Sequence, residues 1–209
     1  HSLFSDTIRS MRALVASYVL GHLLMGARDE SVNLLRRALQ HAETTSRYNV
    51  YFGRGRDSYD LSGRVVHESI FNVVSGAYRC PSTQQGYSPF TTWTRGLSWV
   101  LCGYPEQLEF LATVDDAEIG ATGLSYFPDR QAAVTRFLET AEAVAEFYIE
   151  NTPTNGVPFW DTGAPGLARL GDYLDKPADP YNSEEPIDSP AAAICAQGLI
   201  RLGRYLQAS

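Results

Sequence analysis

The amino-acid sequence predicts an all-α fold in which helices pack in layers. About five segments carry apolar residues at the three- and four-residue spacing of a helix with one buried face. Strand-like and helix-like segments do not alternate regularly, and the connections between the helical segments carry long insertions. These observations favour layers of helices over a parallel sheet covered by helices.

The composition is that of a globular protein with an excess of acidic residues. The 209 residues are 44% hydrophobic and 20% charged, and the formal net charge is −7. Because nucleic-acid binding needs a concentrated basic patch and none is visible, we expect no nucleic-acid partner. Residues 18–25 form the most apolar stretch, which is far too short to span a bilayer, so we expect no membrane partner.

The three cysteines, Cys80, Cys102 and Cys195, lie far apart and form no CxxC pair. They predict neither a disulfide framework nor a zinc site, and they favour a reducing, cytoplasmic compartment. We expect no metal and no cofactor.

Two antiparallel helices are expected first. One covers residues 7–25, and the second begins near Glu30 after the break at residues 26–29. His22 continues the apolar line of the first helix, where a histidine is more often a core residue than a ligand or a base. The other members of this line are Ile8, Met11, Val15 and Tyr18.

The helical period stops between residues 49 and 71. Glycines and short polar residues indicate an irregular excursion, and the alternation over residues 65–71 predicts a short strand. The alternation places His67 and Ser69 on one side, so we expect His67 to be presented rather than buried. The alternative is a histidine that lies at the surface or whose hydrogen bonds are satisfied by a loop.

The central helix is predicted over residues 90–111. Its Arg95 and Trp99 lie nearly opposite the apolar face, one turn apart. A guanidinium beside an indole, preceded by Gln85 and Tyr87 in a loop, suits a sugar acid. The alternative is an arginine stem packed on a tryptophan between helices. The apolar face consists of Phe90, Trp93, Leu97, Val100, Tyr104, Leu108 and Leu111.

Two helices and one long loop complete the chain. A helix over residues 134–148 carries a row of glutamates, which indicates a solvated face. Residues 163–186 are rich in glycine and proline and predict a long ordered loop. The last helix starts at Asp188 or Ser189, with Pro190 in its first turn. Asp188 is either only a cap, or it points into the cavity and orients a group of the ligand.

Several blocks of the sequence resemble segments of the unsaturated glucuronyl hydrolases. Gln85-Gly86-Tyr87-Ser88 followed by Trp93-x-Arg95-Gly96-x-x-Trp99 resembles the family's QGYxDxxxWxRGxAW segment. Three more blocks occur in the family's order: residues 41–45 resemble AHADTT, residues 155–161 resemble DGVPYWD, and residues 188–202 resemble DSSAAAIAACGLLEL.

The resemblance implies an (α/α)6 barrel of six helical hairpins around a funnel. Since the expected helices make less than half of such a barrel, we expect residues 1–209 to be the carboxy-terminal portion of a single barrel domain. The missing amino-terminal half is then a partner of this chain. Without it, inner faces such as Ile8, Met11 and Tyr18 are expected to form an exposed apolar patch.

The resemblance also implies a glycosidase acting on uronic-acid-containing oligosaccharides. In this family, an aspartate protonates C4 of a 4,5-unsaturated uronic acid and helps water to attack C5. On this basis, the expected catalytic residues are His67 and Asp6, and the expected substrate-binding residues are Gln85, Tyr87, Trp93, Arg95, Trp99, Trp160, Asp161 and Asp188.

One feature of the family is not matched. Its (I/V)DxxMN-like segment is replaced here by residues 7–13, where no aspartate stands at the matching position, and Asp6 is the nearest carboxylate. The acid is therefore Asp6 or a residue outside this chain. The alternatives are a glucuronidase acting on saturated glucuronides, or a non-catalytic sugar-binding module on the same scaffold.

Overall fold

The computed structural model describes residues 1–208 and is mostly helical. The α-helices are α1 Met11–Val19, α2 Leu34–Asn49, α3 Thr94–Leu111, α4 Asp116–Ala121, α5 Arg130–Glu150 and α6 Ser189–Ala208. The short 3-10 helices are η1 Ser5–Ser10, η2 Ala27–Asp29, η3 Leu167–Arg169 and η4 Tyr173–Asp175. The strands are β1 Ser2–Phe4, β2 Glu68–Phe71 and β3 Tyr78–Ser82.

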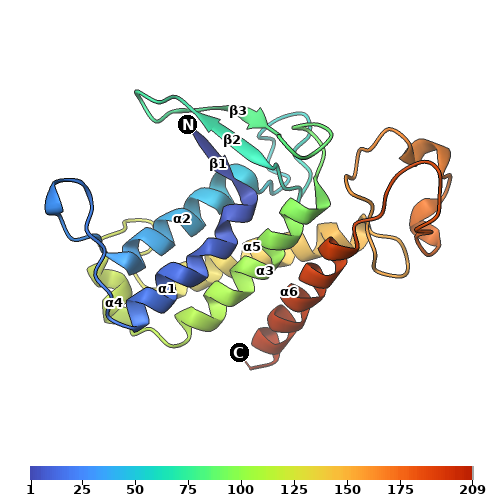
Figure 1. Ribbon diagram of the computed structural model, residues 1–209. Coiled ribbons are helices and arrows are strands. Elements are labelled where there is room, and N and C mark those ends of the chain that lie inside the picture. The colour runs from blue at the N-terminus through green and yellow to red at the C-terminus, as the bar shows by residue number, and fades with distance from the viewer. Residues whose placement is uncertain (209) are drawn as a thin grey trace.

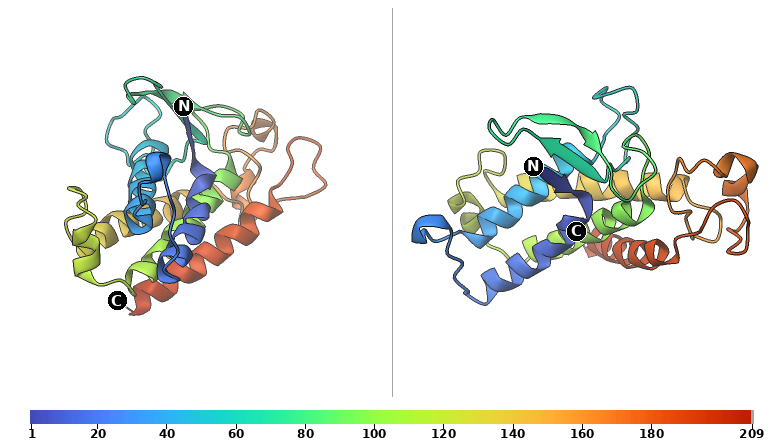
Figure 2. Two further views of the ribbon diagram at one scale, coloured as in Figure 1. Left: turned by 60° about the vertical axis from the view of Figure 1, so that its left-hand side comes forward. Right: turned by 45° about the horizontal axis from the view of Figure 1, so that its top comes forward.

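The long helices form two layers. Helices α1, α3 and α6 lie side by side in one layer, and α2 and α5 lie behind them (Figure 1). The small sheet lies at one end of the helices, and residues 151–188 project beside the start of α6 (Figure 2). Within residues 1–208, no helix is both long and apolar enough to cross a lipid bilayer.

Helix α3 lies at the centre of the core. It packs against α6 on one side, against η1 on the other and against α5 behind. Phe90 does not belong to it, because α3 begins at Thr94, and the Phe90 side chain is 43% exposed. Every other member of the predicted apolar face is buried, so the face itself is confirmed.

Helices α3 and α6 approach so closely that only a glycine fits between their backbones. A Cβ atom added at Gly198 of α6 would lie 2.5 Å from the carbonyl oxygen of Leu101 in α3. By contrast, a Cβ added at Gly203, further along α6, would meet nothing within 4 Å. The contact at Gly198 therefore fixes how near α6 can lie to α3.

The first predicted helix is too long. The helical segment ends at Val19, because Gly21 adopts a left-handed conformation with φ 67° and turns the chain away. His22 is exposed, so its interpretation as a core residue is wrong. Ile8 and Met11 are buried within the core, and they do not form the exposed patch that was expected.

The start of α2 is set by a side-chain cap. The Asn33 carboxamide oxygen accepts a hydrogen bond from the Arg36 N–H at 2.9 Å, which satisfies one of the free donors of the first turn. The helix therefore begins at Leu34 and not near Glu30. Residues 24–32 instead form a small turn closed by a hydrogen bond from the Val32 N–H to the Leu24 carbonyl.

The predicted strand is shorter than expected and is the middle strand of a sheet. Strand β2 pairs antiparallel with β1 on one edge and with β3 on the other, with Ser69 opposite both Leu3 and Pro81. Neither β1 nor β3 was predicted. His67 precedes β2 and is only 3% exposed, so the expectation that it is presented is wrong.

From α5 onward the structure agrees with the predicted pattern, whereas α4 was not predicted. Glu142, Glu146 and Glu150 are exposed along α5, as a solvated face requires. Residues 151–188 form the expected long loop, which includes η3 and η4. This loop has an apolar cluster of its own, separate from the main core and formed by Phe159, Ala164, Leu167 and Ala178.

Substitutions at the two glycines of α6 test the close contact with α3. We expect Gly198→Ala to lower the free energy of unfolding by about 1–3 kcal/mol, because the added methyl group must push the two backbones apart. Gly203→Ala should raise it by up to about 1 kcal/mol, since alanine favours a helix more than glycine does. Urea denaturation measures both, and equal effects at the two positions would contradict the close contact.

Candidate functional site

The candidate site is built around the start of α3. The Thr94 hydroxyl donates a hydrogen bond to the Phe159 carbonyl oxygen at 2.8 Å, and the Thr94 N–H donates to the Trp160 carbonyl oxygen at 3.0 Å. Trp93 and Asp161 form an isolated antiparallel bridge beside these bonds. The loop after α5 is therefore fastened to the first turn of α3.

Asp161 connects this junction to the loop of residues 84–88. One carboxylate oxygen accepts a hydrogen bond from the Tyr87 N–H at 2.9 Å, and the other accepts from the Gly163 N–H at 2.9 Å. Burial raises the pKa of Asp161, and the two N–H groups oppose that shift. Asp161 is fully buried, and its observed role is to hold two loops together.

His67 binds the backbone of the same loop through its ring. Its Nδ1 atom accepts hydrogen bonds from the N–H groups of Gln84 at 3.1 Å and Gln85 at 3.3 Å, so a neutral ring carries its proton on Nε2. Burial lowers the pKa of His67, and the negative charges of Asp6 and Glu68 oppose this shift. His67 is therefore neutral near pH 7 and positions the backbone of Gln84 and Gln85.

The aromatic residues near His67 are also buried. The His67 ring lies edge-on to Trp93, with 4.8 Å between the ring centroids. Trp93 is 8% exposed, so it shapes the support of the site and does not offer an open stacking surface. Among residues 1–208, no hydrogen-bond partner is found for the His67 Nε2 atom.

Arg95 is paired within the chain. Its Nε atom lies 3.2 Å and 3.1 Å from the two carboxylate oxygens of Asp188, and its Nη2 atom lies 3.0 Å from one of them. The same Asp188 accepts a hydrogen bond from the Ala191 N–H at 2.9 Å and so caps α6. Asp188 is therefore a cap, as one of the two sequence alternatives has it, and it also orients the Arg95 side chain, a contact that the sequence did not predict.

The pairing leaves part of Arg95 open. The Arg95 side chain is 42% exposed, whereas the Asp188 side chain is 1% exposed. Asp188 occupies the edge formed by Nε and Nη2, and the Nη1 side of the guanidinium is not used in the hydrogen bonds described for residues 1–208. One edge of Arg95 can therefore still bind a carboxylate.

Trp99 is covered on one face by an arginine that was not predicted to belong to the site. The guanidinium carbon of Arg9 lies 4.3 Å from the centre of the Trp99 ring. Arg9 and the half-buried Asp6 both belong to η1, where residues three apart lie on the same side. Asp6 therefore lies on the side of η1 that carries Arg9.

The remaining predicted residues lie at the edge of this region. Gln85 and Tyr87 are exposed, with Tyr87 at 53%. The Trp160 Nε1–H donates a hydrogen bond to Glu185 at 2.7 Å, and Glu185 also accepts one from the Gly166 N–H. Glu185 was not singled out from sequence, because a single glutamate in a long loop gives no signal of its partner.

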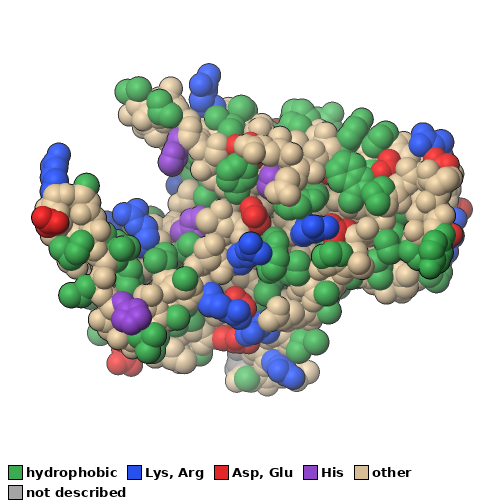
Figure 3. Space-filling view, viewed as in Figure 1, with side chains coloured by type: hydrophobic (Ala, Val, Ile, Leu, Met, Phe, Trp, Pro, Cys, Tyr) green, Lys and Arg blue, Asp and Glu red, His purple; other side chains and the backbone are tan. Residues whose placement is uncertain are grey.

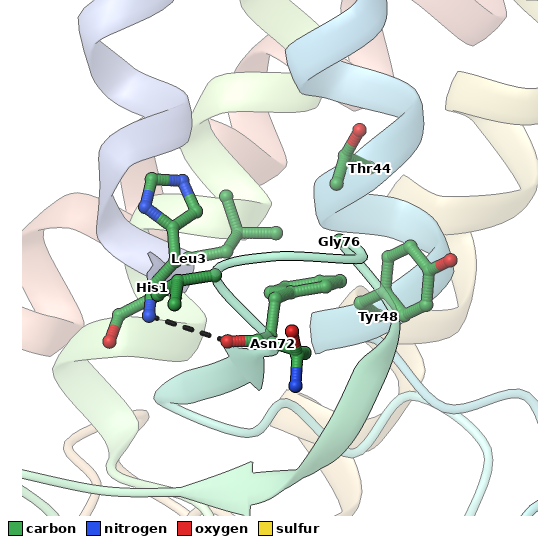
Figure 4. A pocket seen from close by; sticks show the side chains of 9 residues that line it. His1, Leu3, Thr44, Tyr48, Asn72 and Gly76 are labelled. Carbon is green, nitrogen blue, oxygen red and sulfur yellow. Dashed lines mark hydrogen bonds between the residues drawn. The ribbon is translucent and has the colours of Figure 1, made fainter.

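Charged side chains gather on the face of the molecule that is formed by α1, α3 and α6 (Figure 3). Besides the pair of Arg95 and Asp188, this face carries ion pairs of Arg12 with Glu106 and of Arg201 with Glu109. A pocket of about 530 Å³ lies elsewhere, between the sheet and α2, and none of the predicted site residues lines it (Figure 4).

Comparison with curated proteins identifies related sequences. The chain is 30% identical to an unsaturated glucuronyl hydrolase of Formosa agariphila over 170 residues, which are 80% of this chain and 31% of the relative. The chain is a relative of the unsaturated glucuronyl hydrolases. It is also 27% identical to the unsaturated glucuronyl hydrolase of Bacillus sp. strain GL1 over 174 residues, which are 83% of this chain and 34% of that protein. No family model matches the sequence.

Solved structures of unsaturated glucuronyl hydrolases share the fold. The structure of the Bacillus sp. GL1 protein superposes with a TM-score of 0.62 and 22% identity, covering 97% of this chain and 40% of that one. A hydrolase specific for heparin gives 0.63 and 19%, covering 99% and 44%. The predicted fold class, part of an (α/α)6 barrel, is thus confirmed. The chain spans about a third of the length of the curated glucuronyl hydrolases that it matches.

Asp161→Asn tests the link between the two loops. An asparagine retains one acceptor oxygen but turns an NH2 group toward the other N–H, so we expect a loss of about 1–3 kcal/mol in the free energy of unfolding. Amide hydrogen exchange should become faster at Tyr87 and Gly163. Asp172→Asn, at an exposed position of the same long loop, is the control. Unchanged exchange at both amides would show that Asp161 does not hold them.

Proposed function

We propose that this chain forms part of a glycosidase acting on uronic-acid-containing oligosaccharides, with the vinyl-ether hydration activity of the unsaturated glucuronyl hydrolases. The observation that carries the proposal is the 30% identity over 170 residues to a hydrolase of that name. One related structure, at 22% identity, is that of a hydrolase with dGlcA-Glc-Rha-Glc, which supports a saccharide that ends in a uronic acid.

The arrangement of the site supports recognition of a uronic acid. The open edge of Arg95 offers N–H donors to a carboxylate, and the exposed Gln85 and Tyr87 offer hydrogen-bonding groups to sugar hydroxyls. Asp188 holds the Arg95 fork in one orientation, so less side-chain entropy is lost when a ligand binds. His67 and Asp161 contribute indirectly, because they position the loop that carries Gln85 and Tyr87.

Asp6 is the candidate acid of this chain. It is half-buried on the same side of η1 as Arg9, and its charge acts on the nearby His67. In the proposed reaction, a protonated carboxyl group transfers its proton to C4, water adds at C5, and the resulting hemiketal opens to release the rest of the sugar. A residue outside these 209 is the alternative acid, and a saturated glucuronide is the alternative substrate.

A non-catalytic sugar-binding module is the second candidate, and one observation favours it. Arg9 stands within residues 7–13, the segment in which the family carries an aspartate. A cation at this place cannot protonate a carbon atom, because arginine holds its proton at any working pH. If Asp6 does not take over the acid role, the chain would bind a uronic acid without converting it.

The reaction can be followed by ultraviolet absorbance. We expect the intact protein to remove the absorbance of the C4=C5 bond from a 4,5-unsaturated uronyl disaccharide. Asp6→Asn should lower kcat by about 100-fold or more, the usual contribution of a positioned acid. Asp175→Asn, which changes an exposed carboxylate in the long loop, should leave kcat unchanged.

The outcomes separate the candidates. Cleavage of a saturated glucuronide without loss of this absorbance would replace the substrate proposed here. Binding of either sugar without turnover would favour the binding module. If the intact protein neither binds nor converts either sugar, the proposal is wrong.

Arg95→Lys tests recognition of the carboxylate. A lysine cannot bind Asp188 and a ligand through two separate edges, so the affinity for glucuronic acid should fall by about 10-fold or more. Binding of glucose, which lacks the carboxylate, should change little. Calorimetric titration with both sugars measures this difference. An equal loss for both sugars would show that Arg95 supports the structure of the site and does not read the carboxylate.

A further inference from the structure

The exposed Arg9 packs on an aromatic ring at the candidate site. Its guanidinium carbon lies 4.3 Å from the centre of the Trp99 ring, a distance at which a cation and an aromatic face attract each other. Trp99 belongs to α3, one turn after Arg95, so both side chains leave the same side of that helix. Arg9 is therefore brought to the face that contains Arg95, although it comes from η1.

The two arginines differ in their charge balance. The charge of Arg95 is compensated by Asp188, with which it makes three short contacts. No carboxylate oxygen of residues 1–208 lies within 4.0 Å of a nitrogen of Arg9. On the same face, Arg12 is paired with Glu106 and so is also compensated. Arg9 thus supplies a positive charge that no ion pair neutralises, on a chain with net charge −7.

The backbone under Arg9 is held firmly. Ile8 is fully buried, and its side chain lies against Gly103 of α3. The Ser5 N–H donates a hydrogen bond to the His67 carbonyl oxygen at 2.8 Å, which fixes the start of η1. The indole of Trp99 then restricts the guanidinium itself. An arginine held in this way loses little entropy when it binds an anion.

We propose that Arg9 is a specificity-determining residue that binds the carboxylate of the sugar together with the open edge of Arg95. Trp99 then acts mainly by orienting Arg9, since the guanidinium occupies the ring face on which a sugar would otherwise stack. The inference rests on the proposed recognition of a uronic acid. It assigns the discrimination between a uronic acid and a neutral sugar to Arg9, which lies outside the four segments that resemble the glucuronyl hydrolases.

Arg9→Gln in the intact protein tests the role of the charge. The ligands are a glucuronic-acid disaccharide and the same disaccharide with glucose in its place, titrated by calorimetry. We expect the affinity for the acidic sugar to fall by about 10- to 100-fold, the range of a hydrogen bond to a charged group, with no change for the neutral sugar. Arg37→Gln makes the same change of net charge at an exposed position on α2 and should alter neither affinity.

Trp99→Leu separates orientation of Arg9 from stacking on the sugar. If Trp99 orients Arg9, this variant should weaken binding of the acidic sugar only. The effect should also shrink when Arg9 is already glutamine, which a double-mutant cycle measures. If Trp99 stacks on the ring, both sugars should lose affinity equally in both backgrounds, and that result overturns the orienting role.

The titrations of the wild type and of Arg9→Gln also separate the inference from the proposed function. If the wild type binds the acidic sugar and Arg9→Gln binds it equally well, the inference is wrong and the proposed function stands. An equal loss for both sugars in Arg9→Gln also overturns the inference, because the charge then does not discriminate. If the wild type binds neither sugar, the proposed function fails and the inference fails with it.

Discussion

Hydrogen bonds between the first turn of α3 and residues 159–162 determine where the polar groups of the candidate site lie. Thr94 binds the backbone of this segment, and Asp161 extends from it to the loop of Tyr87. The Asp188 N–H in turn donates to the Pro158 carbonyl oxygen at 2.7 Å, which brings the start of α6 to the same place. Segments far apart in the sequence therefore meet at one junction, and Arg95 projects from it.

The long helices could be predicted because their buried apolar residues recur at helical spacing along the sequence. The apolar face of α3 has the period of a helix over its whole length, and burial follows that period from Leu97 to Leu111. Helix ends depend on single residues, and this is where prediction was less accurate. Gly21 ends the first helical segment early, and the Asn33 side chain delays the second.

The environment of His67 could not be predicted from alternation. Alternation assumes a sheet with one open face, but His67 lies against Phe4 and Trp93, which come from distant parts of the chain. The sequence indicated which residues belong to the site, but it did not indicate which of them contact each other. Arg95 and Asp188 both stood out, yet their contact joins residues 93 positions apart. Arg9 gave no signal at all, because its partner is the ring of Trp99.

The separate apolar cluster of residues 151–188 has a consequence for the dynamics of the protein. Phe159, Ala164, Leu167 and Ala178 are not part of the main core, so opening of this segment would not break the apolar contacts among the helices. Opening would release Asp161 from Tyr87 and Asp188 from Arg95 in one event. In that case the site would be lost without global unfolding, at a rate set by the opening of this segment.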